Sequence, residues 1–77
     1  MDAVLTDATV SDVIAYLATE RGWGNRDKTA RYLSELARSA AIGSPSWSMY
    51  GNAGETVEIE CRRVPRRGVR YSVTVCR

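Results

Sequence analysis

The stretch TVEIECRRVPRRGVRYSVTVC, residues 56–76, decides the fold of this chain. Apolar and polar side chains alternate on both sides of a segment that contains proline and glycine, which is the pattern of two antiparallel strands joined by a turn. We therefore predict strands over 56–63 and 69–76, with a five-residue loop between them. Pairing Ile59 with Val73 puts the apolar residues of both strands on one face, whereas a slip of one residue would turn every side chain over.

A third strand is predicted at 46–50, in a segment otherwise rich in serine, glycine, asparagine and proline. Trp47 and Met49 interrupt that segment with bulky side chains, which a solvated linker would not carry. Placed beside strand 56–63, these two residues extend its apolar face, and 51–54 forms the turn between the two strands.

The first helix is predicted over 9–21. Thr9 is a helix-capping residue, and Asp12 three residues later completes a capping box. Gly22 ends the helix, and Trp23 is expected to fold back on the last turn as a packing residue rather than a binding residue. The apolar stripe at helical spacing consists of Val10, Val13, Ile14, Leu17 and Ala18.

The second helix is predicted over 26–42, with Asn25 as its N-cap and Gly43 at its end. Small and apolar residues face inward at helical spacing, namely Ala30, Leu33, Ala37, Ala40 and Ala41. The charged residues of the opposite side are Lys28, Arg31, Glu35 and Arg38.

Together these elements predict a single α+β domain of two layers that spans residues 1–77. Two N-terminal helices pack on one face of a three-stranded antiparallel β-meander. With 77 residues, of which 44% are hydrophobic and 26% charged, the chain has the composition of one small folded domain. A domain of this size needs nearly all of its apolar residues in the core.

Catalysis and metal binding are not predicted. The chain has no histidine, no Cys-x-x-Cys spacing and no carboxylate group at metal-ligand spacing. We therefore expect neither an enzyme nor a bound cofactor or metal.

The cysteines and the absence of an apolar run indicate the compartment. Cys61 faces the core in the predicted register, and Cys76 lies on the outer face about five pairs away, roughly 17 Å at strand rise. A disulfide between them is not expected, which agrees with a reducing cytoplasm. No apolar run is long enough to span a membrane, and residues 1–7 lack the features of a signal peptide. A cytoplasmic protein without a membrane partner is expected.

Charge is distributed unevenly along the chain. Residues 61–77 hold six arginines and no acid, whereas residues 1–60 hold five basic and nine acidic residues, which gives +6 against −4. Ten of the eleven basic residues are arginine, a side chain that binds phosphate and carboxylate through two parallel hydrogen bonds. This asymmetry indicates what the protein binds more than how it folds.

The candidate binding residues lie on the last hairpin. Arg66 and Arg67 form its tip, and Arg62 and Arg70 stand opposite each other on its outer face, a like-charge pair that a bound anion would relieve. Arg63 is left out because its place in the alternation points it toward the apolar face. The alternative interpretation is that these arginines keep the hairpin soluble and prevent edge-to-edge aggregation.

Arg31 and Arg38 of the second helix complete the candidate set. A variant of the prediction treats the two helices as a helix-turn-helix and the hairpin as a wing, so that these two residues join the tip arginines. Glu35 in the same stripe would repel phosphate, and an ordinary solvated helix face also explains the stripe.

Two classes of function follow from these patterns. The first is a small non-enzymatic binding protein whose arginine-rich hairpin engages a polyanionic surface, either nucleic acid or a nucleoprotein complex. The second is an inhibitor of the kind that phages and mobile elements encode, anti-CRISPR proteins among them, which would bind a host protein complex and block its nucleic-acid channel. That likeness is one of size and kind, because no motif of the chain carries it. The oligomeric state is left open.

Overall fold

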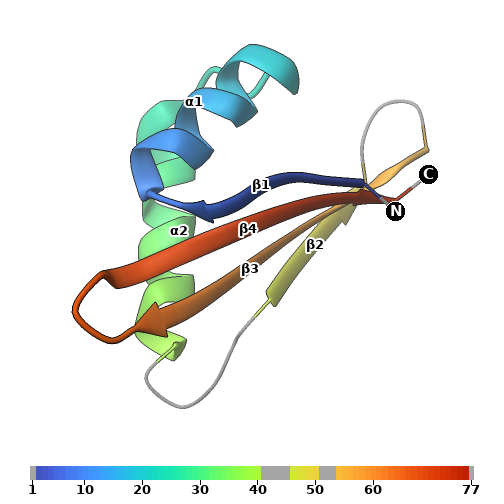
Figure 1. Ribbon diagram of the computed structural model, residues 1–77. Helices are drawn as coiled ribbons and strands as arrows, with labels where there is room; N and C mark the ends of the chain where they lie inside the picture. The colour runs from blue at the N-terminus through green and yellow to red at the C-terminus, as the bar shows by residue number, and fades with distance from the viewer. Residues whose placement is uncertain (1, 41–45, 51–53, 77) are drawn as a thin grey trace.

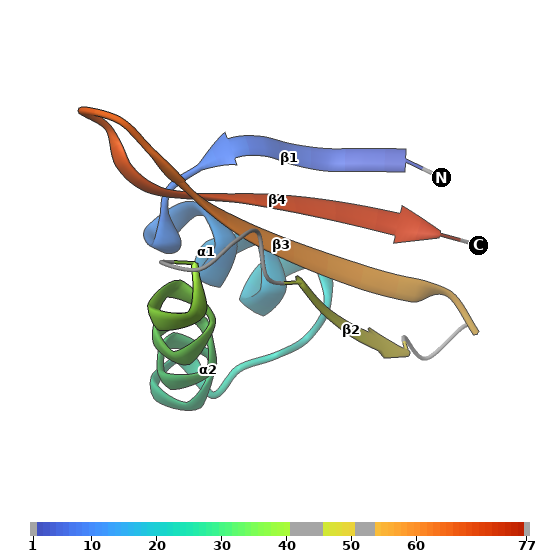
Figure 2. The same cartoon turned by 90° about the horizontal axis from the view of Figure 1, so that it is seen from below.

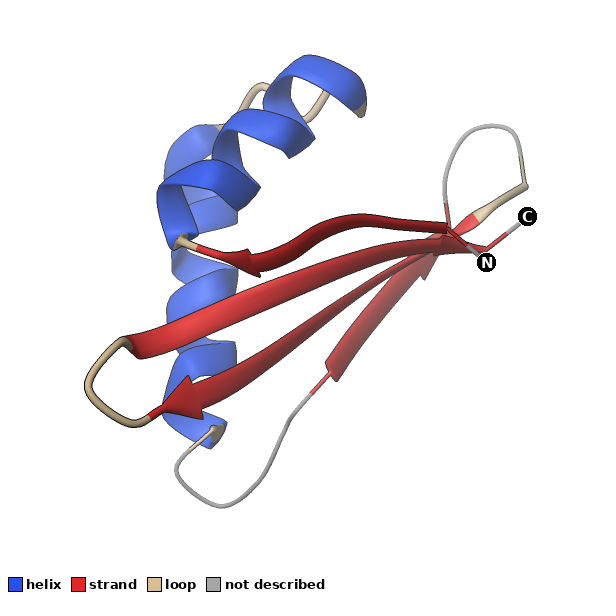
Figure 3. Cartoon of the chain, in the orientation of Figure 1, coloured by secondary structure: helices blue, strands red, loops and turns tan. Residues whose placement is uncertain are grey.

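The computed structural model describes residues 2–40, 46–50 and 54–76 of the chain. Its elements are, in order, β1 (Asp2–Ala8), α1 (Val10–Glu20), α2 (Arg26–Ser39), β2 (Ser46–Tyr50), β3 (Thr56–Val64) and β4 (Gly68–Cys76). The strands form one antiparallel sheet in the order β1-β4-β3-β2, and both helices cover the same face of it (Figure 1 and Figure 2). Figure 3 separates the helical layer from the sheet layer by colour. The predicted α+β architecture of helices packed against an antiparallel sheet is confirmed.

The β3–β4 hairpin has the predicted register. Ile59 pairs with Val73, and Arg62 stands opposite Arg70. The ladder runs one residue further at the turn than predicted, because Val64 pairs with Gly68 and leaves a loop of three residues rather than five. Gly68 has a φ of +82°, a left-handed conformation that lets the chain re-enter the ladder directly after the turn.

Strand β1 corrects the predicted three-stranded meander, and the helices are not the first elements of the chain. β1 pairs antiparallel with β4 and adds a fourth strand to the sheet. Its register shifts between Ala3 and Leu5 and again between Leu5 and Ala8, so its side chains do not alternate in the way that predicts a strand. Ala8 is buried, Leu5 packs against the core, and Val4 remains 39% exposed.

Strand β2 has the predicted bounds and the predicted pairing with β3. Trp47 stands opposite Ile59, and Met49 opposite Val57. The prediction that Trp47 and Met49 extend the apolar face concerns side chains outside the described part of the structure. Most of the predicted turn at 51–54 also lies outside the described residues.

The core lies between the helices and the inner face of the sheet. Leu17 of α1, Leu33 of α2 and Ile59 of β3 are fully buried, and removing such a side chain from water contributes about 1.5–3 kcal/mol each. The Tyr71 hydroxyl of β4 donates to the Leu33 carbonyl over 3.0 Å and joins the sheet to α2. The buried apolar residues are Ala8, Val13, Leu17, Leu33, Ala40, Val57, Ile59, Cys61, Tyr71, Val73 and Val75.

Helix α1 begins and ends at the predicted signals. The Thr9 hydroxyl accepts from the Asp12 backbone N–H, and the Asp12 carboxylate accepts from the Thr9 N–H, which completes the capping box. Gly22 takes a φ of +71°, and the Trp23 N–H donates to the Leu17 carbonyl while its side chain packs against the core. The prediction that Val10 faces inward is wrong, because Val10 lies in the first turn and is 38% exposed.

Helix α2 begins at the predicted cap but ends earlier than predicted. Asn25 accepts from the Lys28 backbone N–H at its start. At its end the Ala40 N–H donates to the Ala37 carbonyl, a tighter bond than the α-helical one, and Ser39 is the last helical residue. The predicted end at Gly43 lies outside the described residues.

The two cysteines are free and lie at separate places in the sheet. Cys61 pairs with Tyr71 and is buried, whereas Cys76 pairs with Thr56 at the far end of the hairpin. Burial raises the pKa of the Cys61 thiol above its ordinary value of 9.0. This thiol therefore behaves as part of the core.

The first prediction concerns Tyr71 at alkaline pH. Burial, and to a smaller extent the neighbouring Cys61 thiol, raises the pKa of the Tyr71 hydroxyl from 10.0 to about 12. The unfolded chain then loses this proton first, so the free energy of unfolding should fall as the pH rises from 10 to 12. Tyr71→Phe should reduce that fall, and at pH 7 it should cost about 1 kcal/mol because the bond to Leu33 is lost.

Urea denaturation followed by tryptophan fluorescence at several pH values would measure this effect. Tyr32→Phe is the control, because Tyr32 is 41% exposed and its replacement should leave the alkaline fall intact. An unchanged alkaline fall in Tyr71→Phe would contradict the assignment.

Candidate functional site

The β3–β4 hairpin extends past the end of the helical layer. In Figure 1 and Figure 2 its turn stands clear of both helices. The last three pairs of the hairpin are Arg62 with Arg70, Arg63 with Val69 and Val64 with Gly68. Of these residues Arg62, Arg63 and Gly68 are exposed, whereas Val64, Val69 and Arg70 are partly buried.

The turn holds Arg66 in an uncommon backbone conformation. The Arg67 N–H donates to the Val64 carbonyl over 3.1 Å, and Pro65 occupies the second position of this four-residue turn. Arg66 takes the third position with a φ of +68°, as in a type II turn, where glycine is normally found. A left-handed conformation costs about 1–2 kcal/mol for a residue with a Cβ atom. Arg66 is thus an exposed cation on a strained, projecting turn.

Arg62 and Arg70 face each other across the outer side of the hairpin but differ in exposure. Arg62 is exposed, whereas the Arg70 side chain is only 20% exposed. The Arg70 Nε atom is buried and has no hydrogen-bond partner among the described residues. Arg70 is therefore less available to a partner than its opposite neighbour.

Asp7 is an acid beside the hairpin, although residues 61–77 themselves contain none. Its Oδ2 atom lies 2.6 Å from Arg67 Nη1, and its Oδ1 atom lies 3.8 Å from Arg70 Nε. Asp7 lies near the end of β1, which pairs with β4, so the sheet brings a residue sixty positions away in the sequence to the hairpin. Two of the four predicted hairpin arginines thus have an acid of this chain beside them.

A second acid lies within electrostatic range of the hairpin. The pKa of the Asp12 carboxyl is held below 3.8, chiefly by the hydrogen bond from the Thr9 backbone N–H, next by the Thr9 hydroxyl, and to a smaller extent by Arg70. Because the capping bonds dominate, the main role of Asp12 is to begin α1.

Arg63 belongs to the candidate site, although its predicted place on the apolar face had excluded it. Its place in the alternation is on the inner side, as predicted, but the residue is exposed, although its cross-strand partner Val69 packs against the core. The side of the strand on which Arg63 lies could be predicted from the sequence, but how far the helices cover the sheet could not. Arg62, Arg63 and Arg66 are all exposed and form no ion pair within the described ranges.

Arg31 and Arg38 are not brought to the hairpin face. Both are exposed on α2, which covers the inner face of the sheet, whereas Arg62 and Arg70 lie on the outer face. Figure 2 shows the hairpin tip pointing away from α2. A single surface of helix and wing arginines is therefore not formed.

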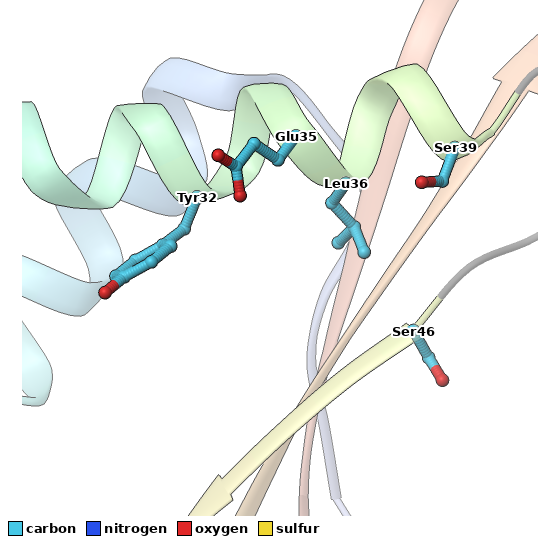
Figure 4. A pocket seen from close by; sticks show the side chains of 5 residues that line it. All are labelled: Tyr32, Glu35, Leu36, Ser39 and Ser46. Atoms are coloured by element: carbon cyan, nitrogen blue, oxygen red, sulfur yellow. The ribbon is translucent and has the colours of Figure 1, made fainter.

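Two cavities lie away from the hairpin. One, of about 240 Å³, lies between α2 and the start of β2 and is lined by Tyr32, Glu35, Leu36, Ser39 and Ser46. In Figure 4 the Glu35 carboxylate points away from both serine hydroxyls, so it does not activate either of them as a nucleophile. The second, of about 490 Å³, is lined by Asp2, Val4, Tyr16, Glu20, Arg21 and Val75.

The second cavity adjoins a partly buried ion pair. Arg21 Nη1 donates to Glu55 Oε1 over 2.7 Å, and Arg21 Nε lies 3.4 Å from the Tyr16 hydroxyl. Glu55 is only 7% exposed and needs this partner. This contact ties the end of α1 to the start of β3 and has a structural role.

Two further findings apply to the described residues alone. None of the helices there has the length and apolar character needed to cross a membrane. Within the same ranges, histidine, cysteine, aspartate and glutamate side chains form no group of three that would hold a metal ion.

The second prediction concerns the strain at Arg66. Arg66→Gly should raise the free energy of unfolding by up to about 1 kcal/mol, because glycine adopts positive φ without a steric cost. Arg66→Asn should act in the same direction by less. Arg66→Ala removes the same charge but keeps the Cβ atom, so it should give no such gain.

Chemical denaturation of the four proteins at one salt concentration would measure these differences. If alanine stabilised as much as glycine, charge repulsion rather than backbone strain would account for the gain.

Comparison of the chain with known protein families, curated proteins and solved structures finds no match.

Proposed function

We propose that this protein is a small binding protein, not an enzyme, whose β3–β4 hairpin engages the backbone of nucleic acid. One observation carries the proposal. Arg62, Arg63 and Arg66 are exposed on both sides and at the tip of a hairpin that stands clear of the helices, and none forms an ion pair in the described part of the chain. A guanidinium group is the side chain best suited to hold a phosphate by two hydrogen bonds.

The shape of the hairpin supports a nucleic-acid partner. Neighbouring strands lie about 4.8 Å apart, and a two-stranded ribbon fits a major groove that is about 12 Å wide. Arginines on both faces of such a ribbon would reach phosphates on both sides of a groove. A flat acidic surface would engage the arginines of only one face.

The charge of the outer sheet face limits the footprint to the hairpin end. Glu58 and Glu60 follow each other on the outer side of β3, opposite Thr74 and Ser72 of β4. These carboxylates repel phosphate, so contact should stop near Arg62. Three phosphate contacts predict weak, sequence-independent binding that falls about 40-fold between 50 and 200 mM salt.

The third prediction tests the hairpin against an equal charge change elsewhere. Arg62→Gln with Arg66→Gln removes two of the three proposed contacts and should weaken binding to mixed-sequence duplex DNA or RNA by about tenfold or more at 50 mM salt. Arg31→Gln with Arg38→Gln removes the same charge from α2 and should change affinity by less than about threefold, because only long-range attraction is lost.

Fluorescence anisotropy with labelled duplex and single-stranded oligonucleotides, read at 50 and 200 mM salt, makes this comparison. Equal losses in the two variants would move the binding surface away from the hairpin. Absence of binding by the wild type at 50 mM salt would exclude the proposal.

The alternative function is an inhibitor, of the anti-CRISPR kind, that binds a host protein complex and blocks its nucleic-acid channel. Its support is the bipolar sheet face, on which Glu58 and Glu60 lie on one half and Arg62 and Arg70 on the other. The acidic half would face the basic wall of such a channel. A folded wild type that binds no nucleic acid at low salt would favour this alternative.

A further inference from the structure

We propose that the Asp7 carboxylate fills an anion site between Arg67 and Arg70, and that a backbone phosphate takes its place when the hairpin binds nucleic acid. This inference rests on the proposed function. It adds a fourth phosphate contact to those of Arg62, Arg63 and Arg66, and it assigns Asp7 a role in setting affinity.

The geometry shows that the two guanidinium groups converge on one anion. The two carboxylate oxygens of Asp7 point to different arginines, Oδ2 to Arg67 Nη1 at 2.6 Å and Oδ1 to Arg70 Nε at 3.8 Å. Arg67 and Arg70 come from the turn and from β4, so the hairpin itself fixes their spacing. A carboxylate and a phosphate monoanion share the charge and the paired oxygens that such a site recognises.

Asp7 fills this site incompletely. The 3.8 Å separation from Arg70 Nε is too long for a hydrogen bond, and that buried Nε atom has no partner among the described residues. A buried donor without a partner is unfavourable. A phosphate carries more acceptor oxygens than a carboxylate, and their tetrahedral arrangement suits two donors that approach from different directions.

The ion pair between Asp7 and Arg67 is also weak enough for a phosphate to replace the carboxylate. The Arg67 side chain is 56% exposed and the Asp7 side chain 33% exposed, so their ion pair lies at the surface, where water and salt weaken it. Arg62 stands opposite Arg70 and forms no ion pair with any of the residues that the structure describes, and this like-charge pair gains from an additional anion. Both conditions favour replacement of the carboxylate by a phosphate of a bound strand.

The backbone at Asp7 indicates the variant for the test. Asp7 has a φ of +52°, and asparagine is one of the few residues that tolerate this region. Asp7→Asn therefore removes the charge while keeping the fold of β1. Glu60→Gln is the matched control, because it removes one negative charge from the outer face of the hairpin two residues before Arg62.

The expected result is tighter binding by Asp7→Asn with an unchanged salt slope. Its affinity for a mixed-sequence duplex at 50 mM salt should rise about threefold to tenfold above wild type because no carboxylate has to be displaced, and the slope of log K against log salt should stay near the wild-type value because a phosphate occupies the site in both proteins. Glu60→Gln should raise the affinity by less than about threefold. In an Arg67→Gln background, Asp7→Asn should bring no gain, because the released arginine is missing.

A measurement on the wild-type protein complements the variants. The side-chain Nε–H signals of arginine in two-dimensional NMR should shift for Arg67 and Arg70 on addition of a short duplex, and the signal of Arg31 should not. Unmoved Arg67 and Arg70 signals would show that Asp7 keeps its place.

The outcomes test the anion site separately from the proposed binding of nucleic acid. If the wild type binds and Asp7→Asn behaves as Glu60→Gln does, general charge accounts for the change and the anion site is overturned while the proposed function stands. If neither wild type nor Asp7→Asn binds at 50 mM salt, both are overturned. Binding by Asp7→Asn alone would show that the carboxylate keeps its place in the wild type, which would overturn both.

Discussion

The pairing of Ile59 with Val73 fixes the face on which every side chain of the central hairpin lies. Strand side chains alternate, so a slip of one residue would expose Val57, Ile59 and Cys61 and turn Glu58 and Glu60 toward the helices. Three consequences depend on this register: the sheet has an apolar face for the helices to cover, Tyr71 reaches the Leu33 carbonyl, and Arg62 meets Arg70 on the outer side. The packing of the core and the placement of the candidate site thus have one cause.

The same register also brings like charges together, and strand β1 reduces the repulsion between them. It sets two arginines opposite each other beside a turn that carries two more, and such an arrangement destabilises an isolated hairpin. Strand β1 supplies the compensation, because its pairing with β4 brings Asp7 between Arg67 and Arg70. A single acid leaves Arg70 Nε without a hydrogen bond, so the relief is partial. An unpaired buried donor and a residue such as Arg66 at positive φ are both typical of ligand-binding surfaces.

Features with a local signal could be predicted from the sequence, and features set by distant contacts could not. The caps at Thr9 and Asn25 and the alternation of β3 and β4 each depend on neighbours within a few residues, and the structure confirms them. β1 has two register shifts that break its alternation, and it pairs with residues near the other end of the chain. No local pattern marks such a strand, so the sequence could not show the acid that it carries to the hairpin.

This difference changes how the charge of the sequence should be interpreted. A run of arginines without neighbouring acids suggests that all of them are free for a partner, yet Asp7 is sixty residues from Arg67 and still forms an ion pair with it. Arg63 changes in the opposite direction, because it is exposed although the alternation places it on the inner side. The hairpin therefore keeps its total charge, while the available arginines are those of β3 and Arg66 in the turn. Since salt dependence counts the phosphates that a protein contacts rather than the arginines that it contains, the salt slope reports this redistribution directly. A slope near 2.7 corresponds to the three exposed arginines that form no ion pair in the described part of the chain, and a slope near 3.6 requires that the carboxylate has left its site.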